Sequence, residues 1–345
     1  MKHAPHWLVA FALASESLLC TQVTPWHGVV PPPDRTPHKV HFITVEDNVK
    51  LEVLDWGGSG RPVVLLTGLG DNAHVYDRFA PKLTMAYHVY GISRRGFGAS
   101  SSPAATGNAY DADRLGDDVL AVIDSLKLNK PVLLGHSVAG EELSSVGSRH
   151  PEKVSGLIYL DAGYSYAFYD PERGNFDLDW KELQRKVEQI KNAPMASASA
   201  MKELLDTSLP AFERDLRDIQ KNSETMPEAL RAYVASLPTP PPPTARPFDA
   251  IIAGAQKYTN IPVPILTIFA VPSYFGSGPM ALSDPAVRAA FEANIKASIE
   301  AQAKAFERGV PSARVVLIPN AHHYVFQSNE ADVLREMNAF LGSLP

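Results

Sequence analysis

Two hydrophobic patterns alternate along the chain from residue 38 to residue 345. Short continuous apolar runs are typical of strands that are buried on both faces of a parallel sheet. There are six such runs: Pro62–Thr67, Tyr87–Ile92, Pro131–Gly135, Val154–Leu160, Val263–Ala270 and Ala313–Ile318. Before them, Lys39–Val45 and Val49–Trp56 alternate apolar and polar residues around Asp47-Asn48, which predicts an antiparallel hairpin. We therefore expect eight strands, of which the first pair is antiparallel.

Helical patterns lie between these strands or close the chain. They cover Val75–Met85, Asp113–Leu126, Val138–Arg149, Pro285–Arg308 and Glu330–Leu341. Alternation of strands and helices predicts an α/β protein with an open, mostly parallel sheet that is flanked by helices.

One segment interrupts this alternation. Residues 164–258 contain no strand pattern, and their helical patterns are Trp180–Asn192, Ala200–Thr207, Ala211–Asn222 and Pro227–Ser236. An all-helical block between two strands predicts an inserted cap on a core formed by residues 38–163 and 259–345. The cap ends in the proline-rich segment Pro238–Pro243, which we interpret as a stiff spacer.

The first 37 residues differ from the rest of the chain. Lys2 precedes the apolar run Trp7–Ala14, which resembles a secretory signal, and the proline-rich residues 21–37 predict an extended tether. We expect export to the periplasm or out of the cell, and the alternative is a disordered leader on a cytoplasmic protein. No apolar stretch reaches the ~18–20 residues that a membrane span needs.

The amino-acid composition argues against some classes of binding partner and of metal site. The 345 residues carry 32 basic and 38 acidic side chains, a net charge of −6, and no run of Lys or Arg. Such a chain offers no cationic face for a phosphate backbone, so we expect no nucleic-acid partner. The single cysteine, Cys20, excludes an intrachain disulfide and a cysteine-based zinc cluster.

Ser137 is the candidate nucleophile. It lies in Gly135-His136-Ser137-Val138-Ala139-Gly140, between a strand pattern and a helical pattern. A serine on a strained strand-to-helix turn needs small neighbours two positions away on each side, and Gly135 and Ala139 meet that need. The competing interpretation is an ordinary glycine-rich turn. A serine also needs a base, which the chain order nucleophile, acid, histidine predicts in the loop after the last strand.

An acyl-transfer site needs backbone N–H donors for the oxyanion. One candidate is the N–H of Val138, directly after the serine. The other is the N–H of Leu69 in the loop after Pro62–Thr67, because Gly68 and Gly70 free the backbone to turn it inward.

These motifs resemble the α/β-hydrolase fold family in its serine-hydrolase form. The string Ser93–Ser100 is similar to the family's D-x-R-G-x-G-x-S, with Ser93 at the aspartate position. The family's A-G-H string matches Ala321-His322-His323, so the resemblance implies His323 as the base, with His322 as the alternative. The resemblance covers about residues 38–165 and 260–345 and does not cover the cap.

The resemblance leaves two aspartates as candidates for the acid that orients the histidine. The family most often places the acid after the seventh strand, where the first carboxylate is Asp284. Some members place it after the sixth strand, where Asp161 follows Val154–Leu160. Asp284 before Pro285 also has the pattern of a helix cap. Asp161 is therefore our first assignment and Asp284 the alternative.

Aromatic residues are dense after this aspartate. Tyr164, Tyr166, Phe168 and Tyr169 are candidates to line an apolar pocket, and the alternative is that they pack the cap. We predict a carboxylic-ester hydrolase that acts on a small or medium, mainly apolar molecule and needs no metal or organic cofactor. A lactonase, an amidase or a cofactor-free peroxidase on the same residues, or a slow-turnover ligand receptor, are the alternatives.

Overall fold

The computed structural model describes residues 37–192, 198–226, 246–274 and 284–345, together with the single positions 228, 231, 232 and 235. From residue 24 onward the chain divides into two compact units. One comprises Thr24–Phe168, Pro242–Gly276 and Gln302–Pro345. The other contains Tyr169–Pro241 and Ser277–Ala301.

An eight-stranded sheet forms the centre of the first unit, in the order β1-β2-β4-β3-β5-β6-β7-β8. The strands are β1 (Lys39–Glu46), β2 (Val49–Gly57), β3 (Pro62–Leu66), β4 (His88–Ile92), β5 (Val132–His136), β6 (Gly156–Leu160), β7 (Ile265–Tyr274) and β8 (Ala313–His322). β2 pairs antiparallel with β1 and β4, and all pairs from β4 to β8 are parallel. The predicted α/β fold with a mostly parallel sheet is confirmed.

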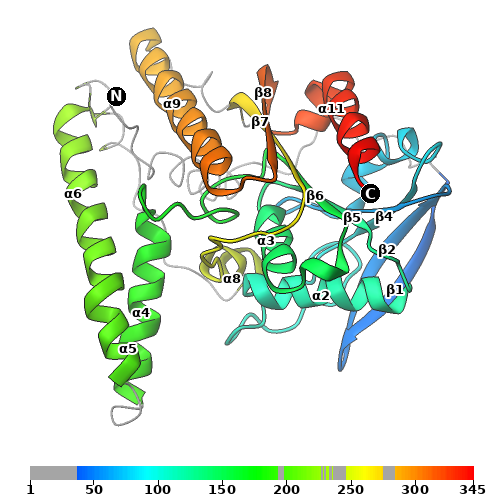
Figure 1. Ribbon diagram of the computed structural model, residues 1–345, viewed down its shortest axis with the longest axis horizontal. Helices are drawn as coiled ribbons and strands as arrows, with labels where there is room; N and C mark the ends of the chain where they lie inside the picture. Colours follow the sequence, from blue (N-terminus) through cyan, green and yellow to red (C-terminus); the bar gives the residue numbers. More distant parts are fainter. Residues whose placement is uncertain are drawn as a thin grey trace. The chain divides into compact units, whose positions relative to one another are not determined.

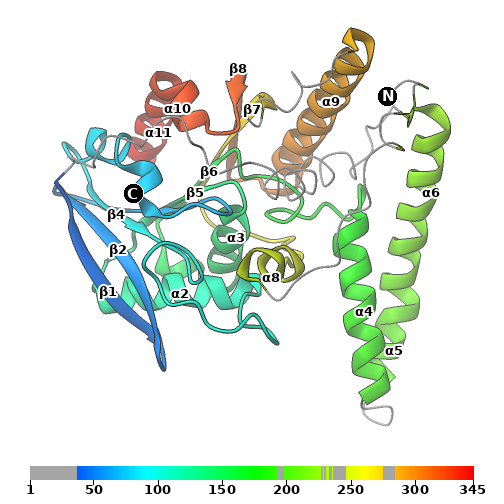
Figure 2. The same cartoon turned by 180° about the vertical axis from the view of Figure 1, so that it is seen from behind.

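Alternate residues of the strands pack into two cores, one on each face of the sheet. In β5, Leu133 packs in the core that contains α2 (Ala112–Ser125) and α3 (Ala139–Arg149). Its neighbours Val132 and Leu134 pack in the opposite core with α11 (Glu330–Ser343). Figure 1 shows α2 and α3 on one face and α11 on the other, and Figure 2 shows the same layers from behind. Because both faces are covered, the strands are continuous apolar runs in the sequence.

The strand order reverses at β3, which has β4 on one side and β5 on the other. In open α/β sheets, loops that leave the carboxyl ends of two such strands diverge and open a crevice where ligands bind. Leu69 lies in the loop after β3 and Ser137 directly after β5, so both lie at this reversal.

The prediction of one helix over Val75–Met85 is wrong. This segment forms two short 3-10 helices, η1 (Ala73–Tyr76) and η2 (Ala80–Lys82). Pro81 has no backbone N–H, and its ring would clash with the carbonyl four residues earlier in an α-helix. Two further short helices, α8 (Pro247–Ala253) and α10 (Val325–Ser328), lie where the hydrophobic pattern predicts none.

Within the segment between β6 and β7, the described residues form several helices. They form α4 (Phe176–Asn192), α5 (Ala198–Glu203), the π-helical turn η4 (Leu204–Ser208) and α6 (Leu209–Thr225). Phe212 of α6 packs against Phe176 and Trp180 of α4, with ring centroids 5.4 and 5.3 Å apart. The predicted long helix after β7 is α9 (Pro285–Gly309).

Several predictions fall outside the described residues. They are the signal-like leader with Cys20, the proline-rich segment Pro238–Pro243 and most of the helical pattern Pro227–Ser236. Export therefore stays a prediction, and so do the cap boundaries at residues 164 and 258, although both positions are described. Among the helices that the structure describes, none is both long enough and apolar enough to span a membrane.

Candidate active site

Ser137 lies at the sharp turn between β5 and α3. Its φ angle is +55°, in the left-handed region that residues other than glycine rarely adopt. Small residues allow this turn: a Cβ atom on Gly140 would stand 2.1 Å from the carbonyl oxygen of Ala162. The N–H of Ser137 donates to the carbonyl of Leu160, the last residue of β6, at 3.3 Å. The turn therefore presents the buried serine beside the carboxyl end of β6.

Asp161 directly follows β6, and its fully buried carboxylate accepts four hydrogen bonds. One oxygen, Oδ1, accepts from the Tyr164 hydroxyl at 2.8 Å and from the Ala270 N–H at 3.0 Å. The other, Oδ2, accepts from His323 Nδ1 at 2.7 Å and from the Ser273 hydroxyl. These donors offset the cost of burying a carboxylate. With Nδ1 held in this way, His323 has the tautomer whose Nε2 can accept a proton.

The candidate histidines and aspartates differ in their surroundings. His323 is buried directly after β8, whereas His322 is exposed at the end of that strand. Asp284 is also exposed, and its Oδ1 accepts from the Ala286 N–H at 2.8 Å, as an N-terminal helix cap does. Asp161 and His323 are thus the acid and histidine that the structure brings into contact.

A tight turn after β3 carries the first candidate oxyanion donor. The Gly68 carbonyl accepts from the Asp71 N–H at 3.3 Å, and Gly70 has a φ angle of +88°, as the third residue of a type II turn requires. Leu69 lies between the two glycines, and its side chain packs against the hydrophobic cluster that contains Val138. The backbones of Leu69 and Val138 therefore belong to adjoining loops, after the neighbouring strands β3 and β5.

Two of the four candidate aromatic residues have hydroxyl groups at this site. The Tyr164 hydroxyl donates to Asp161, and the Tyr166 hydroxyl lies close to Ser137. Burial, followed by the nearby charge of Asp161, raises the pKa of both tyrosines well above the usual value. Both hydroxyls therefore keep their protons at neutral pH.

The other two aromatic residues have packing contacts. Phe168 belongs to a hydrophobic core, where its ring centroid is 5.3 Å from that of Phe306. Tyr169 lies in the other unit, and its hydroxyl donates to Asp179 at 2.7 Å. These contacts favour the packing alternative for Phe168 and Tyr169.

His136 is a residue of this site that the sequence does not single out. Its buried ring lies 4.5 Å from the ring of His323, and its Nε2 is 3.1 Å from the His323 carbonyl oxygen. Burial, with a smaller effect of His323, lowers the pKa of His136 well below the usual value. The ring is therefore neutral, and it donates from Nε2 to the backbone of His323. Its position next to Ser137 was the available signal.

Ser93 stands where the family motif has an aspartate. Its hydroxyl donates to Glu52 Oε2 at 2.6 Å and accepts from the Ala73 N–H at 2.9 Å. Glu52 lies on β2 and is buried. The carboxylate of Glu52, from the strand next to β4, therefore lies beside Ser93.

Comparison with known proteins gives the class. A family profile described as the alpha/beta hydrolase fold matches residues 61–329. An "AB hydrolase superfamily protein" of Bacillus subtilis is 35% identical over 124 residues, 35% of this chain and 45% of that protein. A 2-(acetamidomethylene)succinate hydrolase of Mesorhizobium japonicum is 24% identical over 284 residues, 82% of this chain and 89% of that protein. The solved structure of an esterase from Exiguobacterium antarcticum has a TM-score of 0.55 and 20% identity, and covers 88% of this chain and 100% of that chain.

The chain belongs to the α/β-hydrolase fold family. It spans less than half the length of the Bacillus subtilis relative. The likeness to the esterase structure, at 20% identity, shows the fold alone.

Proposed function

We propose that this protein is a serine hydrolase that cleaves a carboxylic ester through an acyl-enzyme. The observation that most supports it is the 2.7 Å hydrogen bond between His323 Nδ1 and Asp161 Oδ2. That pair follows β8 and β6, and Ser137 follows β5, which is hydrogen-bonded to β6. A histidine oriented by a buried carboxylate beside a strained serine is the arrangement that acyl transfer needs.

The reaction has two halves. Ser137 Oγ attacks the ester carbonyl while His323 Nε2 takes its proton, and Asp161 stabilises the resulting imidazolium. The N–H groups of Leu69 and Val138 bind the oxyanion, and His323 then protonates the leaving alkoxide. In the second half, water attacks the acyl group on Ser137 with His323 as base, and the carboxylic acid leaves.

The apolar side chains around the two proposed oxyanion donors support the mainly apolar character of the proposed substrate. The side chains of Leu69 and Val138 pack in one cluster with Tyr110, Leu115 and Ile251. Apolar walls with a few polar groups are typical of small-molecule sites. The Tyr166 hydroxyl beside Ser137 is such a polar group.

A serine at position 137 also distinguishes the proposed ester hydrolysis from other reactions that proteins of this fold catalyse. Epoxide hydrolases and haloalkane dehalogenases of this fold use an aspartate nucleophile, because their intermediate is an alkyl ester of the enzyme. A serine at that position favours acyl transfer instead. Lactones and amides would enter the same chemistry, and peroxidase turnover or slow turnover as a receptor are the remaining alternatives.

Labelling and turnover together test the proposal. We expect a fluorophosphonate probe to label the folded wild type but not Ser137→Ala, and p-nitrophenyl esters to be hydrolysed by the wild type alone. A series of increasing acyl length, with lactones and amides beside it, defines the substrate class. Absence of labelling in the folded wild type would contradict the serine-hydrolase assignment, while labelling with negligible turnover of every substrate would favour the receptor.

A further inference from the structure

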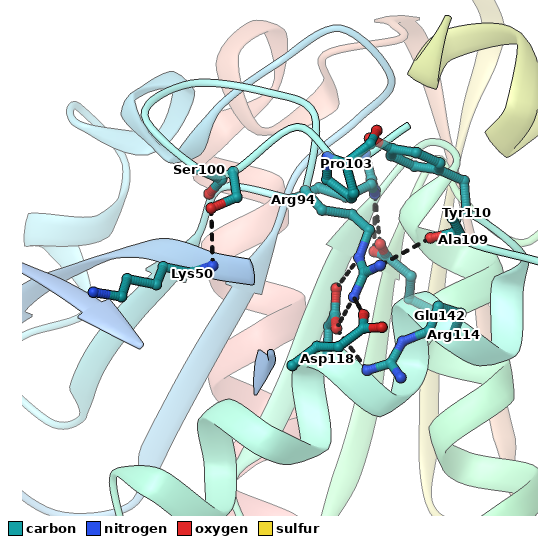
Figure 3. Close-up of polar contacts among 12 residues, drawn as sticks. Lys50, Arg94, Ser100, Pro103, Ala109, Tyr110, Arg114, Asp118 and Glu142 are labelled. Carbon is teal, nitrogen blue, oxygen red and sulfur yellow. Dashed lines mark hydrogen bonds and ion pairs between the residues drawn. The ribbon is translucent and has the colours of Figure 1, made fainter. Parts of the chain in front are cut away.

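A buried ion pair connects the loop region after β4 with the helix that follows the nucleophile (Figure 3). Arg94 comes two residues after β4, and its Nε and Nη2 donate to the two carboxylate oxygens of Glu142 on α3. Both side chains are at most 4% exposed. Two-point contact between a guanidinium and a carboxylate fixes direction as well as distance.

The rest of the Arg94 guanidinium holds the loop after β3. Nη2 donates to the Thr67 carbonyl at 2.7 Å, and Nη1 donates to the Gly68 carbonyl at 3.2 Å. A trans peptide unit is planar, so its N–H points away from its C=O. The Leu69 N–H shares a peptide unit with the Gly68 carbonyl, and it therefore points away from Arg94.

Glu142 connects Arg94 to the helix that carries the second oxyanion donor, the N–H of Val138. It lies four residues after Val138, which is one turn of α3 further on. One ion pair thus contacts the peptide unit of the Leu69 N–H and the helix that begins at the Val138 N–H. We propose that Arg94 and Glu142 are positioning residues that hold the two oxyanion donors in one geometry. This inference rests on the proposed acyl-transfer function.

The next residue provides a matched control. Arg95 is also buried, but its guanidinium donates to Asp118 at 2.6 and 2.7 Å, to Glu46 at 3.0 Å and to the Ala109 carbonyl at 3.1 Å. These partners lie on α2, on β1 and in the segment before α2. A loss that is specific to Arg94 therefore reports on the donors rather than on buried charge in general.

The test compares Arg94→Lys with Arg95→Lys on a p-nitrophenyl ester that the wild type hydrolyses. A lysine cannot hold two carbonyls and both carboxylate oxygens at once. We expect Arg94→Lys to lower kcat ~10–100-fold, somewhat less than removal of a donor, with KM within about threefold. The inhibition constant of a trifluoromethyl ketone, which forms an oxyanion on the serine, should rise by a similar factor. In Arg95→Lys we expect kcat, KM and the inhibition constant of the ketone to stay near the wild-type values, while the midpoint of unfolding falls.

A double variant keeps the test valid if Arg94→Lys does not fold. Arg94→Met with Glu142→Leu removes both charges, so no buried charge is left alone, and we expect it to fold and to show the same loss of kcat. An active wild type with unchanged kcat and ketone affinity in a folded Arg94 variant would overturn the positioning role alone. An equal loss in Arg95→Lys would do the same. A folded wild type without turnover and without labelling of Ser137 would instead overturn the proposed function, and the positioning role with it.

Discussion

The carboxyl end of β6 and the N-terminus of α9 each carry an aspartate that suits the family pattern, but the two carboxylates have different donors. Asp161 is buried, and its donors on β7 and after β8 lie 109, 112 and 162 positions away in the chain. Asp284 is exposed, and its nearest donor is the Ala286 N–H, two positions away. A carboxylate that bonds to the next turn caps a helix. Convergence of distant donors, one of them a histidine, marks a candidate catalytic carboxylate.

Exchange of each aspartate for asparagine tests this comparison most strongly. We expect Asp161→Asn to lower kcat ~10³–10⁴-fold, because the neutral amide no longer stabilises the imidazolium and favours the wrong tautomer of His323. We expect Asp284→Asn to leave kcat unchanged. Steady-state turnover of one p-nitrophenyl ester checks both variants, and the opposite ranking would mean that Asp284 is the acid.

A substitution at Gly140 changes the packing of the backbone next to Asp161 and leaves the Asp161 side chain itself unaltered. A Cβ atom on Gly140 would stand 2.1 Å from the Ala162 carbonyl oxygen, so Gly140→Ala must displace the segment that follows Asp161. We expect the free energy of unfolding to fall by ~3 kcal/mol or more, and turnover to fall with it. Gly342→Ala is the control, since its Cβ would meet open space on α11. Equal urea midpoints for the two variants would contradict the predicted contact.

Asp215 is buried like Asp161, but it lies beside a second carboxylate. Burial first, and then the neighbouring Asp179, raises the pKa of Asp215 to about 8. Between about pH 4 and about pH 8 the folded state therefore holds a proton that the unfolded state has released, so stability falls as the pH rises. Asp215→Asn should remove this slope and be more stable than the wild type at pH 8 by on the order of 1 kcal/mol.

Urea unfolding at pH 5 and pH 8 measures this effect. If the free energy of unfolding changes by the same amount between pH 5 and pH 8 in the wild type and in Asp215→Asn, Asp215 does not retain a proton in the folded protein. The same measurement on Asp161→Asn gives the change in the free energy of unfolding when a carboxylate with hydrogen-bond donors on both oxygens is lost. Comparison with Asp215→Asn separates this change from the effect of losing a carboxylate that lies beside a second carboxylate.

The smallest expected effect concerns Asp284 as a helix cap. We expect Asp284→Ala to lower the free energy of unfolding by ~0.5–1 kcal/mol, because the first N–H groups of α9 lose their acceptor. Asp284→Asn should stay within a few tenths of a kcal/mol of the wild type, since asparagine caps equally well. Thermal unfolding checks both, and a lower kcat at unchanged stability would instead indicate a catalytic role.

The sheet and the strand-to-helix turn at Ser137 were predictable because their signals are local. Burial on both faces makes each central strand a continuous apolar run, and the run ending at Gly135 leads directly into the Ser137 turn. The helix predicted over Val75–Met85 failed at a local signal too, since Pro81 alone argues against it.

The remaining parts of the site depend on contacts between distant segments. The contacts that favour Asp161 over Asp284 depend on β7 lying beside β6, which brings Ala270 and Ser273 to Asp161. The contact of Arg94 with Glu142 spans 48 positions. Strand order in space sets such pairings, and hydrophobic periodicity does not encode it.

If Ser137 carries the acyl group, the mass of the enzyme during turnover must reveal it. Wild-type protein is mixed with p-nitrophenyl butyrate, quenched in acid within milliseconds and digested for mass spectrometry. We predict a butyryl adduct on the peptide that contains Ser137, accumulating in a burst with p-nitrophenol, and no adduct in Ser137→Ala. Ester turnover without any adduct on Ser137, or an adduct that persists in Ser137→Ala, would show that Ser137 does not carry the acyl group.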